Sequence, residues 1–283
     1  MPDTTCQNSV SPAATLYRDP LALIDWRQLS AHERWLPDAS LSLYGLLEFD
    51  ALDADVRRRL SQYEFINVMY CGLWLESIFL QRVSRFLLPG MPSAEHAHLL
   101  HELREETGHS LMFLRAIEAS GVALPEGSWR APRTAALLGR FAPARGALFW
   151  LAMLIGEHVS DSFNRHLCNE SSDVNPAVRQ ISLLHLADEA RHIEHARGML
   201  ATMLATGGAV GRIALSAAAR VLLWQMTSVF YTPPARFYLL AGLAPGTDWC
   251  AAVLRNPARA QFVAQRMAPT RHLLRALGLK MEG

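Results

Sequence analysis

The segment His185-Leu-Ala-Asp-Glu189-Ala-Arg-His192 carries the first indication of what this chain does. It lies within a helical pattern that runs from about 175 to 203. Each helical residue advances about 100° around the axis, so His185, Glu189 and His192 share one face within an arc of roughly 60°. Two imidazoles and a carboxylate suit divalent iron, manganese or zinc. The alternative is a solvated polar stripe, which helix surfaces often carry.

A second carboxylate–histidine pair occurs upstream, in another long helical pattern. Glu106 and His109 have the same i, i+3 spacing as Glu189 and His192. Two helices that each supply Glu-x-x-His, with one glutamate from each of two other helices, can hold two metal ions inside a four-helix bundle. The repeated pair therefore makes a metal site the better interpretation.

A third pair of the same spacing, Glu95 and His98, shows that one pair alone means little. It falls near the start of its helix, where acidic residues suit the helix dipole. It also lies about 16 Å along the axis from Glu106 and His109. We therefore expect this pair to stay outside the metal site.

The two single glutamates are expected to be Glu76 and Glu157, each within a strongly apolar helical pattern. A carboxylate buried in such a stripe costs several kcal/mol unless it is paired or coordinates a metal. A satisfied buried hydrogen bond is the alternative for Glu76. Asp161, one turn after Glu157, is an alternative ligand or an outer partner. Glu64 is expected to be solvated.

Residues around the predicted ligands suggest an outer layer of contacts. Carboxylates commonly orient ligand imidazoles, so Asp188 is expected to accept a hydrogen bond from the ring N–H of His109. The alternative is a surface salt bridge between Asp188 and Arg191. His195 lies one turn beyond His192 and is expected outside the ligand set. The other histidines are expected to be structural or solvated: His32, His96, His101, His158, His166 and His272.

The pattern along the chain predicts an all-α fold, because no β-alternation or Asn-Gly hairpin signal occurs. Four long helices are expected at about 60–88, 93–120, 144–167 and 175–203, with Ser93 as the cap of the second. A fifth helix follows to Tyr231. Shorter features are a loop-rich arm over 1–40, a short helix at 134–140, and short helices separated by Pro257 and Pro269.

We expect one domain over 1–283, with a bundle core at about 60–206 and a helical extension at 209–279. The net charge of +1 gives no sign of the excess of basic residues that nucleic-acid-binding proteins carry. The four cysteines form no Cys-x-x-Cys motif, which suggests free thiols in a reducing compartment. No secretory signal is visible, and the apolar stretches 147–156 and 213–231 are expected to be buried helices. These features predict a cytoplasmic protein without a membrane span.

Taken together, the carboxylate–histidine set resembles that of ferritin-like di-iron carboxylate proteins. That set also suits ferritins, rubrerythrins, desaturases and manganese catalases, but His185 separates this chain from them. A histidine one turn before the last glutamate resembles the di-iron arylamine N-oxygenases, the p-aminobenzoate N-oxygenase family. The similarity covers about 60–204. The predicted metal ligands are Glu76, Glu106, His109, Glu157, His185, Glu189 and His192.

This resemblance implies a ferritin-like four-helix bundle with additional C-terminal helices and a centre of two iron ions. Glu76 and His109 would bind one iron; Glu157, His185 and His192 would bind the other. The two glutamates of the Glu-x-x-His pairs would bridge them. O2 would be the co-substrate, and an external donor such as a ferredoxin or reductase would supply electrons. A homodimer is also expected.

The resemblance further implies oxidation of an amine, in particular an aryl amine, to hydroxylamine, nitroso or nitro products in antibiotic biosynthesis. The segment 61–80 contains no Arg or Lys that could hold a benzoate carboxylate, only Tyr63 and Tyr70. The substrate is therefore open between a neutral aryl amine, a carrier-protein-tethered amino acid and an aliphatic amine, unless Arg220, Arg236 or another C-terminal arginine supplies the charge. Gly72 is expected either to leave space for oxygen or substrate, or to permit close helix packing.

Two other functions fit the same ligand set. One is a ferritin-like protein that binds iron or transfers electrons without an organic substrate. The other is a di-iron oxidase that hydroxylates or desaturates carbon. The apolar C-terminal extension and His185 both argue against the first alternative.

Overall fold

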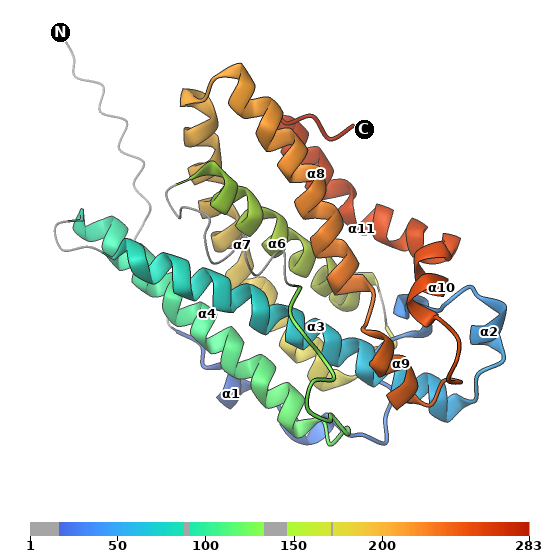
Figure 1. Ribbon diagram of the computed structural model, residues 1–283. Helices are drawn as coiled ribbons and strands as arrows, with labels where there is room; N and C mark the ends of the chain where they lie inside the picture. Colours follow the sequence, from blue (N-terminus) through green and yellow to red (C-terminus); the bar gives the residue numbers. More distant parts are fainter. Residues whose placement is uncertain (1–16, 88–90, 133–145, 171, 283) are drawn as a thin grey trace, which may run out of the picture.

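The computed structural model describes residues 17–87, 91–132, 146–170 and 172–282. Within these ranges the chain is helical and contains no strand, which confirms the predicted all-α class. The four long helices form the centre of the molecule (Figure 1): α3 (Ala54–Val83), α4 (Ser93–Ala119), α6 (Ala147–Arg165) and α7 (Pro176–Thr206).

The remaining elements flank these four helices. On the N-terminal side lie α1 (Pro20–Leu23), η1 (Trp26–Gln28), η2 (Asp38–Ser40) and α2 (Leu47–Asp50). A 3-10 turn, η3 (Ser84–Phe86), follows α3, and a π-helical turn (His166–Glu170) follows α6. The C-terminal extension comprises α8 (Ala209–Tyr231), α9 (Ala235–Ala241), α10 (Trp249–Arg255) and α11 (Pro257–Ala276).

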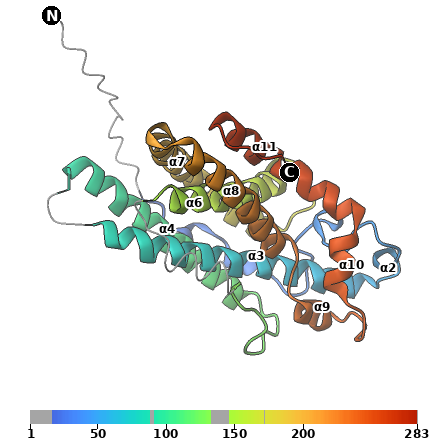
Figure 2. The same ribbon diagram turned by 45° about the horizontal axis from the view of Figure 1, so that its top comes forward.

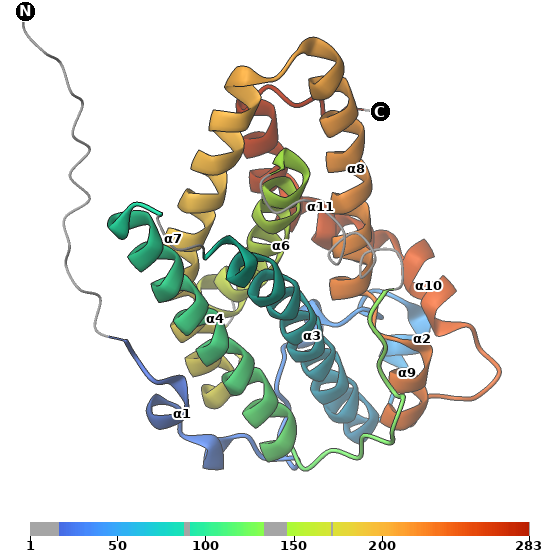
Figure 3. The same cartoon turned by 60° about the vertical axis from the view of Figure 1, so that its left-hand side comes forward.

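The long helices pack as α3 with α4 and α6 with α7, and contacts of α4 with α7 and of α3 with α6 join the two pairs. The helices α8 and α11 lie against α6, on the side of the bundle away from α4 (Figure 2). The short helix α9 packs on α3, at the end of the molecule where α2 and α10 also lie (Figure 3). The bundle is therefore wrapped on one side by the extension.

Local signals explain where several helices begin and end. The side chain of Asn175 accepts hydrogen bonds from the backbone N–H groups of Ala177 and Val178, and Pro176 occupies the first turn of α7, as predicted. Gly121 follows α4 with a φ of +64°, a conformation that glycine adopts without strain. The predicted cap Ser93 is wrong, because Ser93 is the first residue of α4 and the preceding Pro92 has no capping side chain.

Other predicted boundaries need correction. The first long helix begins at Ala54 rather than at 60 and ends at Val83; the predicted end at Leu88, like the predicted short helix at 134–140, lies outside the described residues. Pro269 does not divide the C-terminal segment, since α11 continues through it. Met267 and Leu274 are buried on either side of this proline, so packing outweighs the lost hydrogen bond.

Glu64 is buried rather than solvated, contrary to the sequence prediction. Its carboxylate accepts hydrogen bonds from the backbone N–H and hydroxyl of Ser42, at 2.6–2.9 Å, and lies 3.7 Å from the guanidinium of Arg259. Both partners are distant in sequence, and Tyr238 of α9 lies 3.0 Å from the Ser42 hydroxyl. Glu64 therefore joins the N-terminal segment and the extension to α3.

The helix α8 is apolar enough to cross a membrane by length and composition, in a stretch that extends to Ala241. Only a third of its most apolar 18-residue window is buried, so the predicted buried helix is in large part exposed. One face packs on α6, and the other exposes Val210, Ile213 and Trp224, which is 66% accessible. By contrast, the apolar stretch 147–156 is mostly buried, as expected.

Gly72 permits close packing between α3 and α4 and does not leave open space. A methyl group added at this position would collide with the ring of Phe113, which is itself buried. Of the two predicted reasons for this glycine, close helix packing is therefore the one that applies.

Replacement of Gly72 by alanine is expected to destabilise the fold by about 1–3 kcal/mol, because the Phe113 ring must move within a packed core. Urea denaturation of the purified variant measures this loss. Gly198→Ala is the matched control, since a methyl group there meets nothing within 4 Å and should stabilise α7 by about 0.5–1 kcal/mol. Equal stability of Gly72→Ala and wild type would contradict the packing role.

Candidate metal centre

The seven predicted ligand side chains converge from four helices into the interior of the bundle. Glu76 comes from α3 and Glu157 from α6, while α4 and α7 supply the two Glu-x-x-His pairs and His185. None of the seven is more than 5% exposed. The apolar helix faces that carry these residues therefore place every candidate ligand out of water.

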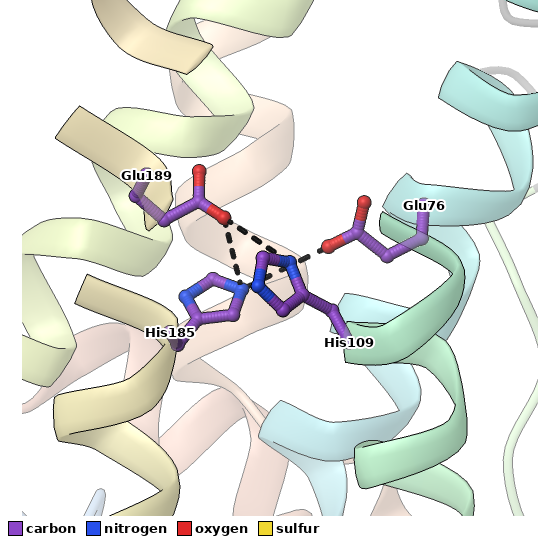
Figure 4. Close-up of side chains that lie close together, drawn as sticks. All are labelled: Glu76, His109, His185 and Glu189. Carbon is purple, nitrogen blue, oxygen red and sulfur yellow. Dashed lines mark ion pairs between the residues drawn. The ribbon is translucent and has the colours of Figure 1, made fainter. Parts of the chain in front are cut away.

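One group of donor atoms combines three helices, as Figure 4 shows. Nε2 of His185 lies 3.3 Å from a carboxylate oxygen of Glu189 and 3.8 Å from one of Glu76. Nδ1 of His109 lies 3.5 Å from the same oxygen of Glu189. These four side chains point at a common centre, with their donor atoms within 4.8 Å of one another.

The other donor atoms form two overlapping groups. Nδ1 of His192 lies 2.8 Å from one oxygen of Glu106 and 3.7 Å from Glu189. The second oxygen of Glu106 lies 3.1 Å from Nδ1 of His109. Glu76, Glu106 and Glu157 also bring one carboxylate oxygen each within 4.8 Å. Because Glu106 and Glu189 belong to groups that share members, both are placed to bridge two ions.

The division of ligands between the two ions stays a prediction. The resemblance assigned His185 to the ion held by Glu157 and His192. In the structure its imidazole is grouped with Glu76 and His109 instead. Both groupings include Glu189, which adjoins all three histidines, so the common centre does not depend on the division.

The donor set fits two divalent metal ions. Five buried polar atoms of the centre make no hydrogen bond of acceptable geometry with the described residues: Glu106 Oε1, His185 Nε2, Glu189 Oε1, Glu189 Oε2 and His192 Nδ1. Unsatisfied buried polar atoms are strongly unfavourable, so their convergence indicates an absent partner. The four carboxylates together carry a charge of −4 when ionised, which two divalent cations would neutralise.

Without cations, the buried carboxylates oppose one another. Burial raises the pKa of Glu76 well above its usual range, and the charges of Glu106 and Glu157 raise it further. The pKa of Glu157 is raised in the same way, by burial and by the charges of Glu189 and Glu106. A bound metal ion would offset both effects, because its positive charge attracts each carboxylate and takes the place of the lost water.

The imidazoles are held by partners outside the centre. Nε2 of His109 lies 3.4 Å from Asp188, as the sequence predicted, and Nε2 of His192 lies 3.0 Å from Glu105. Each carboxylate immediately precedes the glutamate of one pair and contacts the histidine of the other. These contacts fix the rings so that Nδ1 faces the centre.

Sequence reasoning missed Glu105, although the signal was present: it precedes Glu106 as Asp188 precedes Glu189. It also treated the Asp188–Arg191 ion pair as an alternative to the imidazole contact. Both occur, because Arg191 lies 2.9 Å from Asp188 and 2.8 Å from Glu105. One guanidinium therefore joins the two orienting carboxylates.

His185 has a different partner, which the sequence did not indicate. The side-chain amide of Asn164 lies 3.0 Å from Nδ1 of His185. In the structure the amide nitrogen Nδ2 faces the ring, and turning the amide over would let Nδ1–H donate to the amide oxygen and leave Nε2 free to bind a metal. Burial also lowers the pKa of His185 to about 4, which keeps the imidazole neutral at physiological pH.

Several competing candidates lie elsewhere. Asp161 is 2.7 Å from Arg165 and belongs to none of the metal-binding groups found in the described residues. Glu95 and His98 both lie outside the seven-residue centre, as expected, although His98 belongs to a separate group with Glu102 and His195. His195 lies outside the seven-residue centre but contacts Glu102 at 2.8 Å.

Comparison with known proteins agrees with this geometry. A family model described as p-aminobenzoate N-oxygenase AurF matches residues 3–278, nearly the whole chain. The chain belongs to this family. Its members are di-iron N-oxygenases, so a di-iron cofactor, O2 and a reductant are consistent with the buried carboxylate–histidine cluster. The sequence resemblance to arylamine N-oxygenases is thereby confirmed.

The chain is also similar to uncharacterised proteins of Mycobacterium bovis and Mycobacterium tuberculosis. Each is 24% identical over 227 residues, which is 78% of this chain and 66% of the relative. The chain thus spans just under two thirds of the length of these relatives.

Metal binding should release protons and therefore strengthen as pH rises. Although burial alone would lower it, hydrogen bonds to Asp188 and Glu106 raise the pKa of His109 to about 9. At neutral pH this imidazole therefore holds a proton that a metal ion must displace. Below a pH of about 9, the affinity for the metal should fall about tenfold for each unit of decreasing pH, for each proton released on binding. Anaerobic chelator competition for Fe²⁺ at two pH values measures the slope; a pH-independent affinity would contradict it.

Glu105→Ala and Asp188→Ala are expected to weaken iron binding by about 10–100-fold each, because each releases one imidazole from its orienting partner. Iron retained after dialysis against a chelator gives the measurement. Glu118→Ala is the control: this residue lies on the same helix as Glu105, is 69% exposed, and pairs with Arg115 at 3.8 Å. Full iron retention in Glu105→Ala would show that the contact with His192 is dispensable.

Proposed function

We propose that this chain is an O2-dependent di-iron N-oxygenase that oxidises an amine, in particular an aryl amine, to hydroxylamine, nitroso or nitro products. The seven buried residues of the centre are the proposed iron ligands. The observation that carries the proposal is the position of His185. Its unpaired Nε2 faces Glu189 at 3.3 Å, beside a carboxylate–histidine set that is complete without it.

The side chains of the centre contribute position and exclusion of water. Two iron ions held by these side chains would supply the oxidising chemistry with O2. Three imidazoles, each held by an outer partner, give the site more neutral nitrogen donors than a ferritin-type set has. The ring of Phe113 packs 5.4 Å from that of His185 and helps to keep the centre dry.

The substrate is proposed to lack a free carboxylate near the centre. Arg220 donates to the carbonyl of Lys280, and Arg236 is exposed on α9. The buried Arg259 donates to the carbonyls of Tyr231 and Ser40. Arg220 and Arg259 are thus engaged by backbone carbonyls and Arg236 is exposed, which favours a neutral aryl amine or an amine tethered to a carrier protein.

The tyrosines of α3 also favour a substrate without a free carboxylate. The hydroxyl of Tyr63 donates to the backbone carbonyl of Ala123 at 2.8 Å, so it is committed to the fold. Tyr70 stacks on Trp129 with ring centroids 5.4 Å apart. An aromatic pair of this kind can flank an aryl group but supplies no positive charge.

The wider context is also part of the proposal. We propose that a ferredoxin or reductase supplies electrons, and that the protein is a cytoplasmic enzyme of natural-product biosynthesis that neither spans a membrane nor binds nucleic acid. The exposed apolar residues of α8, including Ile213 and Trp224, support a homodimer that covers this face.

Wild type and His185→Ala should be compared with reduced, iron-loaded protein, O2 and a panel of aryl amines. The panel contains p-aminobenzoate, its methyl ester and its thioester, with products identified by mass spectrometry. Wild type should oxidise the amine nitrogen and prefer the esters. His185→Ala should keep its fold and much of its iron, since six ligands remain, while N-oxygenation falls by about tenfold or more.

His101→Ala is the control, because this exposed imidazole lies on α4 outside the centre. Hydroxylation or desaturation of carbon without amine oxidation by wild type would overturn the proposed function. Iron uptake without turnover of any organic substrate would favour the ferritin-like alternative. Unchanged N-oxygenation by His185→Ala would remove the role given to this histidine.

A further inference from the structure

Outside the seven-residue centre, three more potential metal ligands meet between α4 and α7. They are His98, Glu102 and His195, and one donor atom of each lies within 4.8 Å of the others. Nδ1 of His195 lies 2.8 and 2.9 Å from the two oxygens of Glu102, and Nε2 of His98 lies 3.4 Å from one of them. Neither the di-iron centre nor its orienting contacts use these residues.

The distances in this cluster resemble those of the main centre. There, histidine nitrogens and carboxylate oxygens are separated by 2.8–3.8 Å, as between His192 and Glu106 or between His185 and Glu76. Two imidazole nitrogens directed at one carboxylate form a two-histidine, one-carboxylate set. Such a set suits zinc, ferrous or cobaltous ions, whereas magnesium and calcium prefer oxygen ligands.

The surroundings leave one side of the cluster open. Glu102 is buried, with its side chain 3% exposed, whereas the side chain of His98 is 46% exposed. The ring centroids of Trp150 and His195 lie 5.0 Å apart in an edge-to-face contact. An ion here would thus have three protein ligands on one side and water on the other, as in metal sites that keep one coordination position for solvent.

The cluster is adjacent to the main centre but separate from it. Glu102 lies four residues before Glu106 on α4, and His195 lies three residues after His192 on α7. These intervals correspond to about 6 Å and about 4.5 Å along the helix axes. The side chains that ligate the two sites are therefore distinct, although both sites use the same pair of helices.

We propose that His98, Glu102 and His195 form a third metal site, which binds one divalent transition-metal ion and is open to solvent. The histidine pair faces a buried carboxylate, whose negative charge is stabilised by a partner with positive charge. A bound divalent ion meets that requirement and also engages both imidazoles. The site does not depend on the reaction at the di-iron centre.

The test uses the full chain after iron loading, with iron content determined before and after each titration. Co²⁺ is added anaerobically and followed through its visible d–d absorption, and Zn²⁺ is then used to displace it. One Co²⁺ per chain should bind with iron retained. His98→Ala and Glu102→Gln should each weaken this binding by at least about tenfold, because each loses a direct ligand.

His101→Ala is the matched control, since it removes an exposed imidazole from the same helix and should bind Co²⁺ like wild type. His98 is partly exposed, so His98→Ala should fold normally, as circular dichroism can verify. Failure of wild type to bind a further ion, or equal binding by wild type and His98→Ala, would overturn the third site. An iron content below two per chain would instead count against the di-iron centre.

Discussion

Burial of four carboxylates at one point in a helical bundle is the constraint on which the rest of this structure depends. Glu76, Glu106, Glu157 and Glu189 reach the same interior volume. Loss of water and repulsion raise the pKa of Glu76 and Glu157, whereas the neighbouring imidazoles outweigh burial and lower the pKa of Glu106 and Glu189. Histidines relieve part of this cost, and the unpaired nitrogen and oxygen atoms that remain require cations. Two bound metal ions would thus give the physical reason why these polar residues can lie in an apolar core.

The outer contacts show how the bundle keeps its imidazoles in position. Asp188 and Glu105 each contact a histidine on the opposite helix, and Arg191 joins the two carboxylates. This crossed arrangement couples α4 to α7 at the level of the centre. A shift of either helix would move an imidazole away from its partner, so helix packing and ligand geometry are maintained by the same contacts.

The N-terminal segment and the C-terminal extension stabilise the bundle by supplying partners for groups that α3 buries. Ser42 and Arg259 engage Glu64, and the side-chain amide of Asn67 donates to the carbonyls of Val229 and Phe230. The contacts made by the extension link residues more than a hundred positions apart, whereas Ser42 lies 22 positions before Glu64. They show how the extension is attached to α3, although its described residues contribute no candidate ligand to the di-iron centre.

The sequence alone determined the helical class, the four long helices and the seven candidate ligands, because helical periodicity fixes which residues share a face. The family comparison confirmed the resemblance to which His185 pointed. Tertiary structure decided what periodicity cannot encode: the burial of Glu64, the role of Glu105, and the meeting of His98 with His195. Each of these depends on which residue of a distant segment lies opposite, and that is set by packing between helices rather than by spacing within one.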